Sequence, residues 1–138
     1  MAMTFVKSLA HTFRAITLLA TPFCAALILS GGYYYYFASI NACCSPTSPY
    51  RIIYGRASNP TGPYLDRGGV DLSHDGGTIL HGNIVGPGGE SVFTDVGADG
   101  SLSLPTLVYH YYDGANNGAP TLGLNRIAFT ADGWPYVQ

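Results

Sequence analysis

After residue 30, the chain is a series of short apolar and aromatic segments separated by glycine and proline. The segments follow one another at about 10–15 residues, and none shows the period of an amphipathic helix. All 18 glycines and eight of the nine prolines are spread through this region, as tight turns between strands require. Such a chain folds as an all-β sandwich, barrel or propeller, and the pattern alone does not select one of them.

The segments predict six strands, at residues 33–39, 50–55, 78–80, 91–94, 104–112 and 122–129. Turns or loops are expected at residues 59–64, 66–75, 86–89, 95–100 and 113–120. Alternation along the fifth strand places His110 on the face opposite Tyr109 and Tyr111.

Charge excludes one class of function. The chain has a net charge of −2, and its six basic residues are scattered. A nucleic-acid-binding surface needs clustered lysine and arginine, so no nucleic-acid partner is expected.

Residues 1–30 resemble a secretory signal peptide. They carry Lys7 and Arg14, no acidic residue, and an apolar run over residues 15–29. Cleavage is expected near Ala26 or Ser30. We therefore expect a leader over residues 1–30, one domain over residues 31–138, and a secreted protein.

Three other interpretations of this segment stay open. A membrane anchor wants about 20 apolar residues, whereas this run is shorter and contains Pro22. A mitochondrial presequence would need more arginines. Alternatively, residues 26–29, the glycines at 31–32 and residues 33–38 have the pattern of a β-hairpin.

Four sequence stretches together resemble the C-terminal half of glycoside hydrolase family 43: residues 33–66, GPGGESVFTD at 86–95, LVYHYYD at 107–113 and DGWPYV at 132–137. The most similar group is the arabinan endo-1,5-α-L-arabinosidases, whose fold is a five-bladed β-propeller. The resemblance covers roughly residues 31–137 and implies a partial propeller of about two blades. Two unclosed blades leave sheet faces and edges uncovered, so we expect marginal stability or aggregation.

The resemblance also implies that the catalytic acids are missing. Family members use an aspartate base, a second aspartate and a glutamate acid, all upstream of the GGYYY turn, and this chain has no acid before residue 66. The glutamate's place falls near Phe23, with the next pair near Cys24 and Ala25, and none matches. No residue here is therefore expected to be catalytic.

The chain has eight acidic residues, and Glu90 is its sole glutamate. Its position does not correspond to an acid of the family, so we expect a polar residue at a loop edge. Asp95 and Asp99 are expected in turns.

Neither a metal nor a cofactor is expected. Many family members carry a GPGH motif whose histidine binds an ion near the propeller centre, and Gly89 takes its place here. His81 lies a few residues earlier and is an alternative ligand for the same region.

Three residues are candidates for binding substrate: His110, in the shared VYHYYD motif, and Tyr35 and Ser39 on the first aromatic strand. His110 either faces the cleft or packs within the sheet. Cys43 and Cys44 are adjacent, as in the arabinanases, and either form a disulfide or stay free.

By resemblance, the chain is related to hydrolases of O-glycosyl bonds in arabinan and is itself inactive. Its expected partner is arabinan or a related pentose polysaccharide, with a membrane involved only if the leader stays uncleaved as an anchor. Two alternatives remain: a non-catalytic secreted carbohydrate-binding remnant, and a fragment from a truncated gene prediction.

Overall fold

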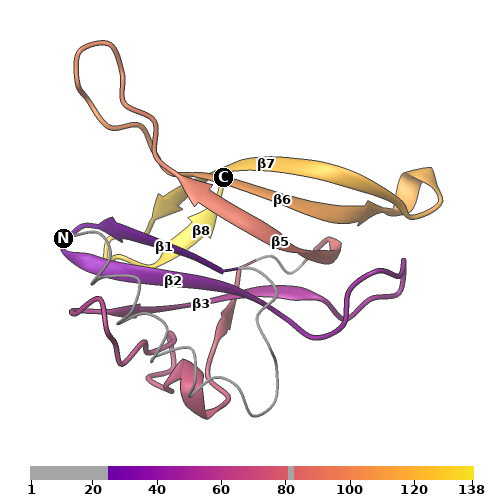
Figure 1. Cartoon of the computed structure of the whole chain (residues 1–138), viewed down its shortest axis with the longest axis horizontal. Helices are drawn as coiled ribbons and strands as arrows, with labels where there is room; N and C mark the ends of the chain where they lie inside the picture. Colours follow the sequence, from indigo (N-terminus) through magenta and orange to yellow (C-terminus); the bar gives the residue numbers. More distant parts are fainter. Residues whose placement is uncertain (1–24, 81–82) are drawn as a thin grey trace, which may run out of the picture.

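The computed structural model describes residues 25–80 and 83–138, which form two four-stranded antiparallel sheets (Figure 1). The first sheet has the order β1 (Ala25–Ser30), β2 (Tyr33–Ile40), β3 (Arg51–Ala57) and β4 (Thr78–Ile79). The second has the order β5 (Val85–Phe93), β6 (Thr106–Asp113), β7 (Ala119–Phe129) and β8 (Pro135–Val137). Two short 3-10 helices, η2 (Leu72–His74) and η3 (Gly114–Asn116), lie in connections. The all-β prediction is confirmed for the described residues.

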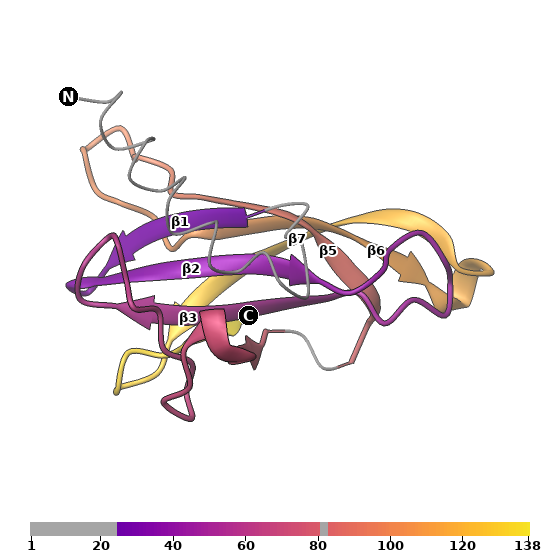
Figure 2. The same cartoon turned by 60° about the horizontal axis from the view of Figure 1, so that its bottom comes forward.

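The two sheets face each other across an apolar core, as Figures 1 and 2 show. Successive residues of a strand point to opposite faces, so β2 directs Tyr35 and Phe37 into this core and Tyr36 to the other side. The core between the sheets is built from Tyr35, Phe37, Ile52, Tyr54, Leu107, Tyr109, Ile127 and Trp134. A second cluster covers the opposite face of the first sheet and contains Tyr36, Ala38, Ile53, Ala57, Tyr64 and Leu72.

Residues 25–30 belong to the first sheet. They form β1, and Ser30 pairs with Tyr33 across a turn in which Gly31 and Gly32 have φ of 55° and 83°. Positive φ at both central residues is typical of the tight turns that suit a twisted hairpin. The hairpin interpretation is confirmed, and a division after residue 30 would cut through it. Residues 1–24 lie outside the described part.

Among the described residues, no helix is long and apolar enough to cross a membrane.

The glycine-rich residues 86–89 are part of β5, whereas a tight turn was expected there. The pairing of β5 with β6 shifts register on both sides of Gly88, so the strand bulges. A Cβ on Gly88 would lie 2.0 Å from the Tyr50 ring. The glycines therefore let an aromatic ring pack directly on the β5 backbone.

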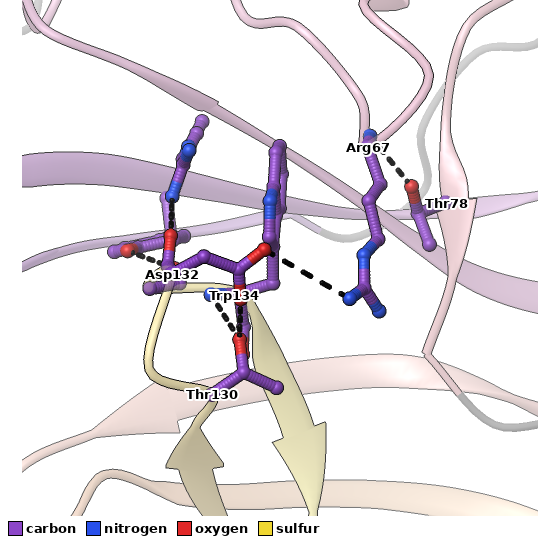
Figure 3. Close-up of polar contacts among 8 residues, drawn as sticks. Arg67, Thr78, Thr130, Asp132 and Trp134 are labelled. Atoms are coloured by element: carbon purple, nitrogen blue, oxygen red, sulfur yellow. Dashed lines mark hydrogen bonds and ion pairs between the residues drawn. The ribbon is translucent and has the colours of Figure 1, made fainter.

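The turn between β7 and β8 joins the second sheet to the first (Figure 3). The Arg56 guanidinium lies 4.4 Å from the centre of the Tyr33 ring and 3.9 Å from that of Trp134. Arg56 Nη1 also donates to the Asp132 carbonyl oxygen at 2.7 Å, and the Tyr35 hydroxyl donates to the Gly133 carbonyl at 2.5 Å. We call Arg56, Asp132 and Trp134 the inter-sheet clamp.

The turn residue Thr130 holds the clamp in shape. Its hydroxyl donates to Asp132 Oδ1 at 2.5 Å and accepts from the Trp134 backbone N–H at 2.9 Å (Figure 3). The hydrogen bond from Thr130 lowers the pKa of the Asp132 carboxyl, as does Arg67, whose Nη2 lies 4.0 Å from Oδ2. Both side chains of that ion pair are largely exposed, so it contributes little to stability.

The other face of the second sheet carries exposed apolar side chains. Leu122 and Leu124 of β7 and Phe93 of β5 are exposed there, and Val108 pairs with Leu124. Exposed apolar patches of this kind normally mark surfaces that another element covers.

Candidate functional site

The candidate site lies at the end of the sheets where the connection between β2 and β3, residues 41–50, meets the second sheet. The backbone N–H of Cys44 donates to the Tyr112 hydroxyl of β6 at 2.7 Å. Gly118, in the β6–β7 connection, approaches Pro46 so closely that a Cβ there would lie 2.7 Å from it. The two connections therefore form one surface at this end, which Figure 1 shows on the right.

Short-range hydrogen bonds order residues 41–50. Ser48 Oγ donates to the Ala42 carbonyl at 2.5 Å, and Asn41 Nδ2 donates to the Pro49 carbonyl at 3.1 Å. Asn41 and Cys44 both have positive φ, a conformation that non-glycine residues adopt rarely. Cys43 and Cys44 form a disulfide and are exposed to solvent.

His110 is half-buried in an aromatic wall. Its ring stacks on Tyr50 with centroids 5.8 Å apart and meets Tyr112 edge-on at 6.0 Å. The structure thus unites the two interpretations of this histidine, since it packs in the sheet and stays partly accessible. Sequence reasoning missed Tyr50, because it comes from a loop that is distant in sequence.

Gly89 lies directly against His110. It has φ of 62°, and a Cβ placed on it would be 2.8 Å from His110 Nδ1. A histidine here, as in the GPGH motif, would collide with the His110 ring on this backbone. Within residues 25–80 and 83–138, no group of three or more histidine, cysteine, aspartate or glutamate residues is placed to hold a metal ion. His81 lies outside the described residues.

Tyr35 and Ser39, which the sequence suggested as substrate-binding residues, are interior residues. Both side chains are 1% exposed. The Tyr35 hydroxyl donates a hydrogen bond to the Gly133 carbonyl, and Ser39 Oγ accepts one from the Gly89 backbone N–H at 2.9 Å. Burial in the core between the sheets leaves neither side chain open to a ligand.

Glu90 is buried in the middle of β5, and the expectation of a loop-edge residue is wrong. It is 4% exposed, and Ser39 Oγ donates a hydrogen bond to its Oε2. Burial raises the pKa of the Glu90 carboxyl, and the hydrogen bond from Ser39 offsets part of that shift. The GPGG sequence suggested a turn because it is rich in glycine, and the bulged strand places the next side chain inside.

None of the other seven acids is buried, and most of them stabilise turns. Asp66 is the clearest case, because it accepts from the backbone N–H groups of Gly77, Val70 and Gly68 at 2.8–2.9 Å. These bonds, that from Gly77 most strongly, lower the pKa of the Asp66 carboxyl. Asp99 accepts from Ser101 in a turn, as predicted. Similar local hydrogen bonds are accepted by Asp71, Asp113 and Asp132.

The side chains at this end of the molecule define the chemistry available there. They offer aromatic rings, a half-buried imidazole and one buried carboxyl group. Inverting glycoside hydrolysis needs two carboxyl groups about 6.5–9.5 Å apart on opposite sides of the bond that is cleaved. Among the eight acids, all of which are described, Glu90 is the one that is buried.

Curated proteins similar to this chain are arabinanases. An Aspergillus clavatus protein named "Probable arabinan endo-1,5-alpha-L-arabinosidase A" is 38% identical over 120 residues, covering 78% of this chain and 36% of that protein. The Bacillus subtilis "Extracellular endo-alpha-(1->5)-L-arabinanase 1" is 41% identical over 101 residues, covering 70% of this chain and 28% of that protein. The chain thus spans about a third of the length of these relatives.

Solved structures agree with this likeness. The Cellvibrio cellulosa alpha-L-arabinanase superposes with a TM-score of 0.73 at 37% identity, over 83% of this chain and 36% of that one. The same enzyme solved with arabinohexaose gives a TM-score of 0.72.

A family-wide comparison extends the match toward the N-terminus. The sequence profile of "Glycosyl hydrolases family 43" matches residues 17–135. This range starts upstream of Gly31, where the resemblance was expected to begin, and includes β1. A match of this extent, with the agreement in fold, means that the chain belongs to glycosyl hydrolase family 43.

Proposed function

We propose that this chain forms two adjacent blades of a five-bladed β-propeller that acts on arabinan. Each four-stranded antiparallel sheet has the size and order of one blade, and the two sheets share a core as neighbouring blades do. The similarity to proteins named as arabinanases supports this assignment. The exposed face carrying Phe93, Leu122 and Leu124 is the surface on which a further blade would pack.

In this proposal, a complete propeller that contains these two blades hydrolyses O-glycosyl bonds in arabinan. This chain alone is inactive. The inactivity of this chain alone is supported by the burial of its acidic residues: one glutamate is buried, and seven aspartates are exposed or half-buried. This inventory supports the proposal, because an inverting hydrolase needs two carboxyl groups held on opposite sides of one bond, and most of these aspartates are hydrogen-bonded within turns.

The test is incubation of the purified 138-residue chain with linear arabinan, followed by chromatography of the products. We expect no arabinose oligomers above a blank without protein. Glu90→Gln serves as the matched variant, because it removes the one buried acid without changing the shape of the side chain. Release of oligomers by the chain, with loss of activity in Glu90→Gln, would overturn the proposal.

A second candidate function is binding of a pentose polysaccharide without cleavage. It is favoured by the half-buried His110, which lies between Tyr50 and Tyr112 beside the exposed residues of the 41–50 connection. Aromatic rings and an imidazole bind sugars through stacking and hydrogen bonds. Retention on immobilised arabinan, lost in His110→Ala and kept in the distant His74→Ala, would support binding.

We also propose an extracellular location. One relative is named an extracellular arabinanase and another an extracellular arabinofuranosidase, and the exposed Cys43–Cys44 disulfide is suited to an oxidising compartment. Expression with a C-terminal tag in a secreting host, followed by detection in medium and cell fractions, tests this location.

A further inference from the structure

A buried polar contact joins the two sheets beside the candidate site. Ser39 of β2 and Glu90 of β5 are 1% and 4% exposed, and the Ser39 hydroxyl donates to Glu90 Oε2. The same Ser39 oxygen accepts the backbone N–H of Gly89 at 2.9 Å. We call Ser39, Gly89 and Glu90 the buried latch.

The surroundings of Glu90 favour an uncharged carboxyl group. Among the residues of the described part, its Oε1 has no hydrogen-bond partner. The ion pair found in that same part joins Arg67 to Asp132, so no described cation is paired with Glu90. A buried carboxylate without a partner cation is costly, and such a group normally takes up a proton instead.

The titratable groups around the latch come from neighbouring strands. Tyr36 of β2 is near enough for the Glu90 charge to act together with burial in raising the pKa of the Tyr36 hydroxyl. On β6, His110 lies against Gly89, and its ring stacks on Tyr50. These groups supply no fixed positive charge to stabilise an ionised Glu90.

We propose that Glu90 is a proton-dependent positioning residue, whose neutral carboxyl is accommodated in the buried contact between β5 and β2. Ionisation places a charge without a described partner cation in this contact; the hydrogen bond from Ser39 favours that charge, but the larger cost of burying it works to separate the two strands. The consequence at the candidate site follows from Gly89, which is bonded to Ser39 on one side and touches His110 on the other. When the latch loosens, Gly89 moves, and the position of the His110 ring against β5 changes.

The direction of the pH effect follows from linkage. Burial raises the pKa of Glu90 in the folded chain above its value in the unfolded chain, about 4.3 for a free glutamate. The folded chain therefore binds the proton more tightly, and the stabilisation is complete below the unfolded pKa. It is lost as the pH rises through the folded pKa.

The experiment exploits the fact that Glu90 is the sole glutamate in the chain. Protein labelled with ¹³C-glutamate gives one side-chain carboxyl signal, which is followed by NMR from pH 3 to pH 9. We expect a titration midpoint above the usual glutamate range and the same midpoint in the Gly89 amide signal. Ser39→Ala removes a hydrogen bond that favours the ionised form, so it should move the carboxyl midpoint upward.

A stability measurement supplies an independent arm. Urea unfolding of the wild type should show a midpoint that falls, relative to Glu90→Gln, as the pH rises. Asp95→Asn is the matched control, because it removes an exposed acid of the β5–β6 connection, and it should keep the wild-type profile.

Two results would overturn the inference. One is a Glu90 carboxyl that titrates in the ordinary glutamate range in the folded chain. The other is a raised midpoint without movement of the Gly89 amide and with the same pH profile in Glu90→Gln.

Discussion

The two sheets are joined by polar groups at two places, and these places differ in how they treat charge. In the inter-sheet clamp, the charged groups of Arg56 and Asp132 lie near solvent. The planar guanidinium of Arg56 packs on the aromatic rings of Tyr33 and Trp134. In the buried latch, Glu90 has no partner cation within residues 25–80 and 83–138 and depends on a serine hydroxyl. The exposed contact between the sheets should change little with pH. The stability of the buried contact, by contrast, depends on whether the Glu90 carboxyl is protonated.

The largest effect should come from removing the clamp's aromatic ring. Trp134 is 8% exposed and belongs to the core between the sheets, so Trp134→Ala should lower the free energy of unfolding by about 3–5 kcal/mol. Tyr136→Ala, two residues later on β8 and 43% exposed, is the matched control and should change little. Urea unfolding followed by fluorescence or circular dichroism measures both. Equal losses in the two variants would mean that the clamp does not hold the sheets together.

The next largest effect should come from adding a side chain at Gly88, next to the buried latch. Gly88→Ala places a methyl group 2.0 Å from the Tyr50 ring and should lower the free energy of unfolding by about 1–3 kcal/mol, because the ring has to move. Gly114→Ala is the control, since a Cβ there meets no atom within 4 Å. The His110 ring signals in NMR should shift in Gly88→Ala and stay in Gly114→Ala. Unchanged signals in both would contradict the stacking of Tyr50 on His110.

A smaller effect should separate charge from stacking within the clamp. Arg56→Lys keeps the charge and loses the planar group that lies between Tyr33 and Trp134, at a cost of about 0.5–1 kcal/mol. Arg67→Lys, which changes an exposed side chain, is the matched control. Thermal unfolding at low and high salt measures the difference. If Arg56→Lys were neutral, the clamp would rest on its hydrogen bonds alone.

The smallest effect is expected at the ion pair on the rim. Arg67→Gln should leave the unfolding midpoint within experimental error, because the partners are 54% and 64% exposed and 4.0 Å apart. A measurable loss that disappears in high salt would show that this pair contributes more than its exposure implies.

Much of the architecture could be predicted from local pattern. Aromatic alternation and glycine turns located β2, β3, β6 and the later part of β7, because strand period and turn chemistry are properties of neighbouring residues. The hairpin between β1 and β2 was visible in the same way. It competed with a signal-peptide interpretation only because an apolar strand and a leader have similar composition.

The candidate site was harder to predict, for a physical reason. Tyr35 and Ser39 lie on a strand whose sequence does not say which face meets the second sheet, and both proved to be interior. Glu90 follows a glycine run typical of a turn, and only the bulged pairing of β5 with β6 turns it inward. Tyr50 meets His110 through packing between sheets, which no local signal contains.

The sequence by itself determined the all-β class, most of the turns and the membership of family 43, since these rest on residue type, spacing and motif. Tertiary structure alone decided the environment of each polar side chain. It placed seven acids at turns and rims and one inside, and it set an unpaired Glu90 against Ser39. Burial and partners act over distances that sequence separation does not measure, because Ser39 and Glu90 are 51 positions apart and yet in contact.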